Sequence, residues 1–213
     1  MPLTVSKNNP KMSSNPAGIL TVISGPSGVG KSTICRKLVD RLGAVWAFSA
    51  TTRPRADQDR HGKPYRFVSR QKFQSLLTDG QFLEHAEVFG QYYGTLALPV
   101  RTALDEGKTV ILEIDVQGAK QIAEKCPDAL FIFLLPPDEQ ALTTRINDRG
   151  RDTPEAVKRR LAAARHEIQV ARDGNLYQHQ VVNDHLDACL DRLEALIRSK
   201  QKPSLTEGTV LDG

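Results

Sequence analysis

The apolar positions of the chain fall into short continuous runs and longer stretches with helical spacing. Four runs are continuous or nearly so, and they lie at residues 19–23, 110–115, 129–135 and 181–182. Between them apolar residues recur every three or four positions, as at Ile34, Leu38 and Leu42 or at Leu186, Leu190, Leu193 and Ile197. Continuous runs are typical of strands buried on both faces. Their alternation with helices predicts an α/β fold with a doubly wound parallel sheet.

Capping residues predict where several elements begin and end. They place a helix end at Gly43, a helix from Ser69 to about Gly80, a helix from Pro99 to Gly107, and a helix that begins at Thr153 with Pro154 in its first position. Residues 46–98 interrupt the alternation with short β-like pieces such as Tyr65–Val68. We therefore expect an inserted subdomain in this interval.

A glycine-rich stretch follows the first apolar run and precedes the first helical pattern. It fits G-x-x-x-x-G-K-[ST] and comprises Gly25, Pro26, Ser27, Gly28, Val29, Gly30, Lys31 and Ser32, with Thr33 next. Glycines let successive backbone N–H groups point into one concavity, and the helix N-terminus adds partial positive charge. Lys31 adds a full charge, and the Ser32 hydroxyl is a candidate Mg²⁺ ligand. Because a predicted strand precedes this stretch and a predicted helix follows it, we interpret it as a nucleotide-triphosphate site rather than a chance glycine turn.

Composition narrows the class of protein without naming a reaction. The chain has 213 residues, 3 cysteines, 5 histidines and a formal net charge of +4. No apolar stretch approaches the roughly 20 residues that span a bilayer, so no membrane association is expected. Few cysteines without C-x-x-C spacing favour a reduced, cytoplasmic protein, and no histidine pair has zinc-ligand spacing. The slight basic excess is interpreted as surface charge and phosphate-binding arginines rather than a nucleic-acid site.

Five further motifs distinguish this chain from most other proteins that have a phosphate-binding loop. They are Ser49-Ala50-Thr51-Thr52-Arg53, Phe82-Leu83-Glu84-His85-Ala86-Glu87, Tyr92-Tyr93-Gly94-Thr95, Leu112-Glu113-Ile114-Asp115-Val116-Gln117-Gly118 and Val182-Asn183-Asp184. In order and spacing they resemble guanylate kinase, over about residues 18–198. The resemblance implies a P-loop NTPase-type sheet with an inserted NMP-binding subdomain and a helical lid. It also implies transfer of the γ-phosphoryl group of ATP to GMP.

The resemblance assigns roles to individual residues. It implies that Ser49, Arg53, Tyr65, Glu84, Tyr93, Thr95 and Asp115 bind GMP. Arg53 and the two tyrosines would hold the GMP phosphate, and Arg53 can do so bidentately. Glu84 and Asp115 would accept hydrogen bonds from the guanine N1–H and N2–H₂ donors, whereas adenine presents an acceptor there. Ser49 and Thr95 would serve the O6 side.

Several of these residues have simpler interpretations when taken singly. Tyr92 and Tyr93 could be core aromatics, and Glu84 with Glu87 could belong to a solvated face. The joint occurrence of the motifs after a phosphate-binding loop favours function. For Asp115 the functional interpretation is favoured even without the other motifs. It follows a predicted buried strand, where burying a carboxylate without a partner costs free energy and where ligands of open α/β sheets bind.

The catalytic assignment is Lys31 with the lid arginines Arg145, Arg149 and Arg160, and Mg²⁺ accompanying ATP. The acceptor phosphate is already ionised near neutral pH, its second pKa being about 6, so no catalytic base is required. Catalysis would then consist of alignment and charge stabilisation. A solvated basic helix face is the alternative for this arginine cluster.

One loop departs from the family pattern T-T-R-x-P-R-x-G-E. Here Arg53 is followed at once by Pro54 and Arg55, so that in ungapped register Ala56 takes the place of the second arginine and Asp59 that of the glutamate. Whether Arg55 or Arg60 replaces that arginine stays open. Glu113 stands where an aspartate is common.

The expected organisation and the competing functions follow from these assignments. We expect a disordered leader at 1–17, a guanylate kinase-like domain at 18–198 and a flexible tail at 199–213. Within the domain we expect a core at 18–45, 99–136 and 170–198, a GMP-binding subdomain at about 46–98 and a lid at about 137–169. Translation could begin at Met1 or Met12. Oligomeric state is undecided. The rivals are a ribose bisphosphate phosphokinase-like enzyme and a non-catalytic guanylate-kinase-like interaction module.

Overall fold

A five-stranded parallel sheet forms the centre of the molecule. The computed structural model describes residues 18–55, 65–147 and 153–201, and all statements below concern these residues. The strand order is β2-β7-β1-β8-β9, and every neighbouring pair is parallel. The strands are β1 (Ile19–Ser24), β2 (Val45–Trp46), β7 (Thr109–Glu113), β8 (Leu130–Leu135) and β9 (His179–Val182). This confirms the predicted doubly wound α/β class.

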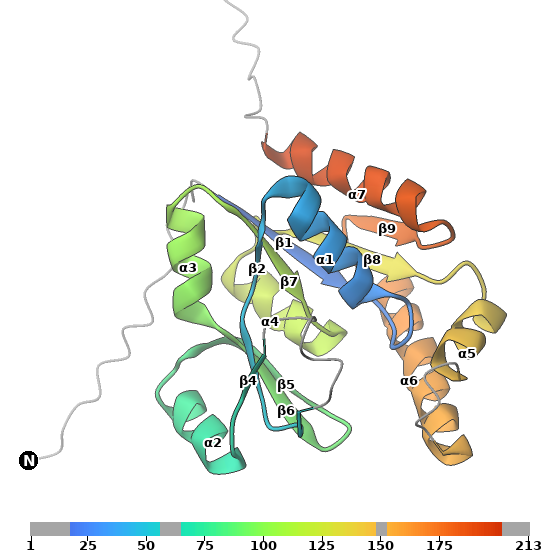
Figure 1. The fold of residues 1–213 in the computed structure, drawn as a ribbon, viewed down its shortest axis with the longest axis horizontal. Helices are drawn as coiled ribbons and strands as arrows, with labels where there is room; N and C mark the ends of the chain where they lie inside the picture. Colours follow the sequence, from blue (N-terminus) through green and yellow to red (C-terminus); the bar gives the residue numbers. More distant parts are fainter. Residues whose placement is uncertain (1–17, 56–64, 148–152, 202–213) are drawn as a thin grey trace, which may run out of the picture.

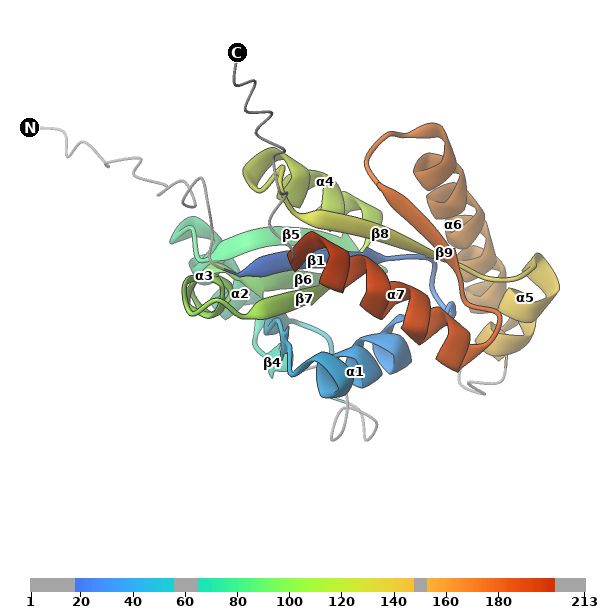
Figure 2. The ribbon, with the colours of Figure 1, turned by 90° about the horizontal axis from the view of Figure 1, so that it is seen from above.

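Helices cover both faces of this sheet (Figures 1 and 2). On one face α1 (Lys31–Leu42) and α7 (Leu186–Gln201) pack through one buried cluster that includes Ile34, Leu38 and Leu193. On the other face lie α3 (Ala97–Asp105), α4 (Val116–Lys125) and α6 (Pro154–Asp173), which contribute to a second cluster. α5 (Glu139–Asn147) packs against α6. Alternate residues of each strand supply the two clusters, which is why the apolar runs are continuous.

A second, four-stranded sheet lies within the range 46–98. Its order is β4-β3-β6-β5, formed by β3 (Ser49–Thr51), β4 (Tyr65–Phe67), β5 (Phe82–Val88) and β6 (Gln91–Leu96). α2 (Arg70–Thr78) covers it, and the Phe73 ring stacks on Phe82 with centroids 4.6 Å apart. β5 and β6 form a hairpin that projects beside the ends of the central strands (Figure 1).

Side chains of α4 bind the outer edge of β5. Gln121 donates to the carbonyl of His85 at 2.6 Å and accepts from its N–H at 3.1 Å. Lys125 donates to the carbonyl of Leu83 at 2.5 Å. The second sheet is thus joined to a helix of the central core by backbone-directed hydrogen bonds.

Most predicted element ends agree with the structure. Gly43 follows α1 in the left-handed conformation, and the Ser69 and Thr153 side chains accept hydrogen bonds from Lys72 N and Ala156 N. The start of α3 was predicted wrongly, since the helix begins at Ala97 rather than at Pro99. Proline is tolerated at this third position because the first four helical N–H groups need no intrahelical acceptor. α7 continues to Gln201, beyond the expected end of the domain.

None of the helices in the described ranges combines the length and the apolar character that crossing a membrane requires.

Candidate functional site

The site lies where β1 and β7 end side by side. β1 is followed by α1, which leads to β2 on one side, whereas β7 is followed by α4, which leads to β8 on the other. Because α1 covers one face of the sheet and α4 covers the other, the two connections leave a crevice at the carboxyl ends of the two strands. The phosphate-binding loop (residues 25–32) leaves β1 here, and Asp115 follows β7. Ile114 N donates to Ile23 O at 3.3 Å and keeps the two strand ends together.

A side chain at Gly28 or Gly30 would strain the phosphate-binding loop. Gly28 and Gly30 have φ of 87° and 102°, a region that favours glycine. A Cβ at Gly28 would lie 2.7 Å from Ile146 Cγ1, and one at Gly30 would lie 2.8 Å from Asn183 Nδ2. Asn183 Nδ2 in turn donates to Val29 O at 2.7 Å. The loop is therefore held in shape by neighbouring elements.

Lys31 and Ser32 begin α1 and face different partners. Lys31 Nζ donates to Gly25 O at 2.5 Å and to Pro26 O at 3.0 Å, so its charge curls back over the loop. Ser32 Oγ donates to Glu113 Oε1 at 2.6 Å. A hydroxyl and a carboxylate thus meet beside the loop, and the longer side chain of glutamate in place of aspartate reaches the serine directly.

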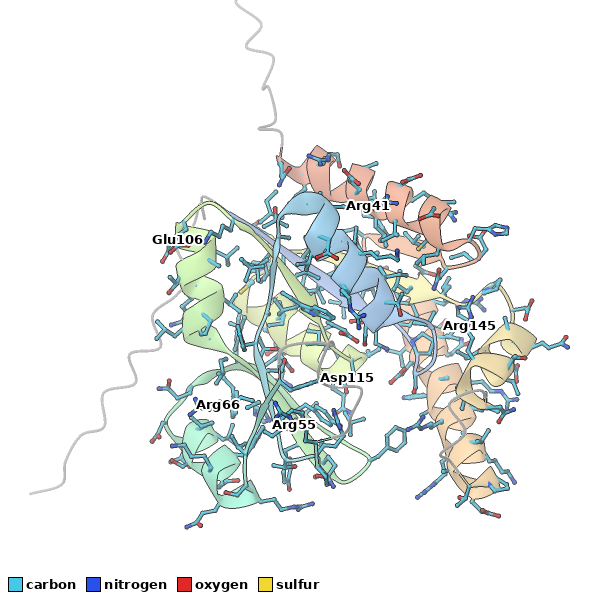
Figure 3. The ribbon with its side chains drawn as sticks, viewed as in Figure 1. Arg41, Arg55, Arg66, Glu106, Asp115 and Arg145 are labelled. Atoms are coloured by element: carbon cyan, nitrogen blue, oxygen red, sulfur yellow. The ribbon has the colours of Figure 1, made fainter. Side chains whose placement is uncertain are left out.

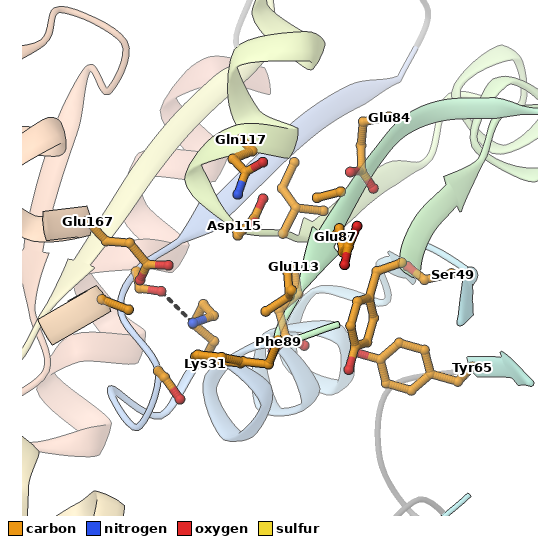
Figure 4. Close-up of a pocket in the computed structure, with 17 residues that line it drawn as sticks. Lys31, Ser49, Tyr65, Glu84, Glu87, Phe89, Glu113, Asp115, Gln117 and Glu167 are labelled. Atoms are coloured by element: carbon orange, nitrogen blue, oxygen red, sulfur yellow. Dashed lines mark hydrogen bonds between the residues drawn. The ribbon is translucent and has the colours of Figure 1, made fainter. Parts of the chain in front are cut away.

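A cavity of about 380 Å³ extends from the phosphate-binding loop toward the second sheet. Figure 4 shows Lys31 and Glu84 on opposite sides of it, with Asp115 between them. The predicted site residues that line it are Gly25, Ser27, Lys31, Ser49, Tyr65, Glu84, Tyr93 and Asp115. The structure therefore brings parts of both predicted nucleotide sites to one cavity.

Glu84 is buried, which excludes the solvated-face interpretation. Its exposed fraction is 4%, and Oε1 accepts from Thr95 N at 2.9 Å and from Thr95 Oγ1 at 2.5 Å. Thr95 Oγ1 also lies 3.5 Å from Ser49 Oγ. A Cβ at Gly118 would lie 2.5 Å from Glu84 Oε2, so the glycine leaves room for the carboxylate. Glu84, Thr95 and Ser49 form a single polar cluster at the far wall.

Asp115 has a structural bond as well as a place in the cavity. It is the N-cap of α4, and its Oδ1 accepts from Gly118 N at 2.8 Å. This bond fixes the carboxylate at the start of the helix, where the helix dipole favours negative charge.

The aromatic residues divide between the core and the cavity. Tyr92 stacks on Phe73 with centroids 5.5 Å apart and is a core aromatic. Tyr93 lines the cavity, where its ring meets Tyr65 edge to face at 6.2 Å. Arg53 is not among the residues that line the cavity; its guanidinium carbon lies 5.6 Å from the Tyr65 ring centre, and its Nη1 donates to Pro54 O at 2.8 Å.

Of the predicted lid arginines, the structure describes Arg145 and Arg160, and neither lines the cavity. Arg145 on α5 donates from Nη1 to Val29 O at 3.3 Å and from Nη2 to Asn183 O at 3.1 Å (Figure 3). It therefore braces the outer side of the phosphate-binding loop. Arg160 lies half-buried on α6. Arg149, like Ala56, Asp59 and Arg60 of the altered loop, lies outside the described residues.

Glu167 of α6 is one of the cavity residues that the sequence interpretation missed. It lines the wall opposite the second sheet, one helical turn after Ala163. Burial raises the pKa of its carboxyl to about 7; Lys31 opposes this rise and Asp115 adds to it. One feature of the sequence could have indicated that Glu167 is buried. It lies four residues from both Ala163 and Ala171, and residues at this spacing share one face of a helix. Small side chains on that face suit a helix packed closely on its neighbours.

We expect Glu167→Gln to stabilise the protein at about pH 8 and to leave its stability near pH 4.5 unchanged. Because the pKa rises from 4.5 to about 7 on folding, the folded state holds this proton more tightly, and the free energy of unfolding falls as pH increases through that interval. Glutamine keeps the shape and cannot ionise. Melting temperatures at both pH values test this, with the exposed Glu124→Gln as control. An equal difference at both pH values would contradict it.

Comparison with known proteins agrees with this geometry. The guanylate kinase family model matches residues 18–200. The chain is 42% identical over 192 residues to a guanylate kinase of Clostridium perfringens, covering 90% of this chain and 88% of that protein. It is 44% identical over 182 residues to a guanylate kinase of a Nostoc species, covering 85% and 90%.

A solved structure shows the same likeness. The crystal structure of guanylate kinase from Anaplasma phagocytophilum superposes with a TM-score of 0.73 at 30% identity, covering 89% of each chain. Family match, relatives and structure cover nearly all of the described residues. The chain therefore belongs to the guanylate kinase family.

Proposed function

We propose that the chain transfers the γ-phosphoryl group of ATP to GMP, giving ADP and GDP. The observation that carries this proposal is the single cavity with the phosphate-binding loop and Lys31 at one side and the buried carboxylate of Glu84 at the other. Such an arrangement suits two nucleotides whose phosphates meet in the middle. The reaction would supply guanine nucleotides and recycle GMP.

Guanine recognition falls to the Glu84 cluster in this proposal. A carboxylate accepts from the N1–H and N2–H₂ donors of guanine, with Asp115 contributing, and Ser49 and Thr95 serve O6. A buried site built on such hydrogen bonds rejects a base that leaves them unpaired, by about 10⁴-fold. Tyr65, Tyr93 and Arg53 would bind the GMP phosphate.

Alignment and charge are the means of catalysis that we assign to these residues. The GMP phosphate oxygen attacks as an anion, so no side chain has to remove a proton. When ATP binds, the Lys31 ammonium group would exchange its hydrogen bonds to the carbonyls of Gly25 and Pro26 for bonds to the ATP phosphates, and would neutralise part of their charge. Arg145, Arg149 and Arg160 would add charge from the lid at 137–169, and the subdomain at 46–98 would carry GMP.

Mg²⁺ fits the oxygen groups beside the loop. Mg²⁺ prefers hard oxygen ligands, keeps several waters and takes few ligands from the protein. The Ser32 hydroxyl, 2.6 Å from the Glu113 carboxylate, provides such a ligand together with an anionic neighbour. Bound with ATP, the ion would neutralise phosphate charge. Glu113 would orient the Ser32 hydroxyl.

We further propose a cytoplasmic location with ATP and GMP as the binding partners, supported by the low cysteine number of 3. Neither competing function is favoured by the family match. An interaction module would need no intact loop, yet Lys31 and Ser32 are both present.

An ADP-release assay with Mg-ATP tests the proposal against its rivals. GMP, AMP, CMP, UMP and ribose 1,5-bisphosphate are offered singly as acceptors, and we expect turnover with GMP alone. Turnover with ribose 1,5-bisphosphate would support the related phosphokinase instead. Silence with all five, while ATP still binds, would support the interaction module.

A further inference from the structure

We propose that Phe89 is a positioning residue that closes the cavity against water when both nucleotides are bound. This inference rests on the proposed function, because it concerns which acceptor receives the phosphoryl group. It is carried by the backbone conformation of Phe89, by the exposure of its ring and by the residues across the cavity.

The turn that holds Phe89 does not favour a phenylalanine. Val88 pairs with Gln91, so Phe89 and Gly90 form a two-residue hairpin turn between β5 and β6. Their φ angles of 49° and 75° are both positive, as in a type I′ turn, for which Asn-Gly is preferred. Among the described residues Phe89 is the one non-glycine with positive φ, and for a bulky side chain that conformation is strained. The turn alone therefore leaves this side chain unexplained.

The outer side of the turn is anchored, whereas Phe89 itself is largely exposed. Arg70 Nη2 donates to Gly90 O at 2.6 Å, and its guanidinium lies 5.2 Å from the Tyr92 ring centre. Tyr92 N donates to Thr52 Oγ1 at 2.9 Å. Phe89 is nevertheless 58% exposed. A well-held backbone thus presents an uncovered aromatic ring.

The ring lines the cavity at the place where water would interfere. Phe89 lines the same cavity as Lys31 and Tyr65 (Figure 4), which we assign to the ATP and GMP phosphates. The facing wall is α6, which presents Ala163 and Glu167. Alanine leaves space for a ring, so approach of the two walls would bury Phe89 on Ala163 and cover the phosphates.

Water exclusion decides the outcome of the reaction. In the transfer, the GMP phosphate oxygen bonds to the γ-phosphorus while the bond to the ADP oxygen breaks, giving ADP and GDP. If water attacks instead, the products are ADP and inorganic phosphate. Closing a phosphoryl-transfer site prevents this side reaction and aligns the reactants.

Phe89→Asn tests the inference because its effects on stability and activity should have opposite signs. Asparagine suits the turn, so we expect the melting temperature to rise by about 2–5 °C. Loss of the ring should lower kcat for GDP formation about tenfold, as misalignment of reacting groups does. It should also release inorganic phosphate, so that more ADP than GDP forms. A merely structural role would lower stability and would keep ADP and GDP equal.

Matched variants separate closure from other causes. Leu98→Ala, at an exposed apolar residue of α3 away from the cavity, should change neither kcat nor the ADP-to-GDP ratio. Phe89→Tyr should keep the wild-type kcat and the wild-type ADP-to-GDP ratio. Phe89→Ala should show the loss, and Ala163→Leu added to it should restore part of the coupling by filling the space from the other wall.

The inference and the proposed function can fail separately. If wild-type protein does not phosphorylate GMP, the function is wrong. If wild type is active and Phe89→Asn keeps its kcat with equal ADP and GDP, or loses stability together with activity, the role of Phe89 is wrong.

Discussion

Lys31→Ala is expected to lower the turnover of GMP and ATP by about 10³-fold while the protein stays folded. The lysine is the one full positive charge that lies within the phosphate-binding loop, and its two present acceptors are carbonyls of that loop. Its removal leaves phosphate charge uncompensated. The fold should survive, because α1 is fixed by the buried side chains of Ile34, Cys35 and Leu38. Initial rates and a thermal melt measure the two effects.

Lys37→Ala is the matched control for this experiment. Lys37 lies on the same helix, is exposed and is not among the residues that line the cavity. It should keep wild-type rates and a similar melting temperature. Near-normal activity of Lys31→Ala would show that the cavity does not work by the proposed alignment of phosphates.

Glu84→Gln is expected to raise KM for GMP about 10²-fold and to leave KM for ATP nearly unchanged. Glutamine is a sharper change than alanine, because its amide oxygen can still accept from Thr95 N and Oγ1. Its NH₂ group would then turn toward the cavity and oppose the N1–H and N2–H₂ donors of guanine. Steady-state kinetics with each substrate varied in turn distinguish the two constants.

A substrate lacking the 2-amino group makes the test specific. Inosine monophosphate should be a poorer acceptor than GMP for the wild type, and this difference should shrink in Glu84→Gln. Gly118→Ala should act in the same direction, since its Cβ would meet Glu84 Oε2 at 2.5 Å. Glu124→Gln, exposed on α4, serves as control. Equal changes in both KM values would contradict base recognition by Glu84.

Much of the fold could be predicted because its signals are local. Continuous apolar runs marked β1, β7 and β8, since a strand covered on both faces has no polar side. Ser69 and Thr153 marked helix starts through side-chain bonds made within three residues. The order of strands in the sheet and the pairing of β3 with both β4 and β6 depend on distant contacts, and no local pattern contained them.

Site residues that belong to a short sequence motif could be predicted. Site residues whose surroundings depend on how distant elements pack together could not. Lys31 belongs to a short motif with a fixed spacing. Glu167 lies among Arg165, His166 and other polar residues of α6, so its helix resembles a solvated one. Its burial arises only because α6 lies across the cavity. The positive φ of Phe89 likewise depends on the register of the β5–β6 hairpin.

The bonds from α4 to β5 have a consequence for how the protein behaves at high concentration. An outer strand normally presents a row of unpaired N–H and C=O groups to which a strand of another chain can add. Over Leu83 and His85 that row is already occupied by Lys125 and Gln121. At the opposite edge of the sheet, β4 has only three residues. Both margins of the second sheet are thus poor templates for strand addition, a protection against aggregation that is independent of the chemistry of the cavity.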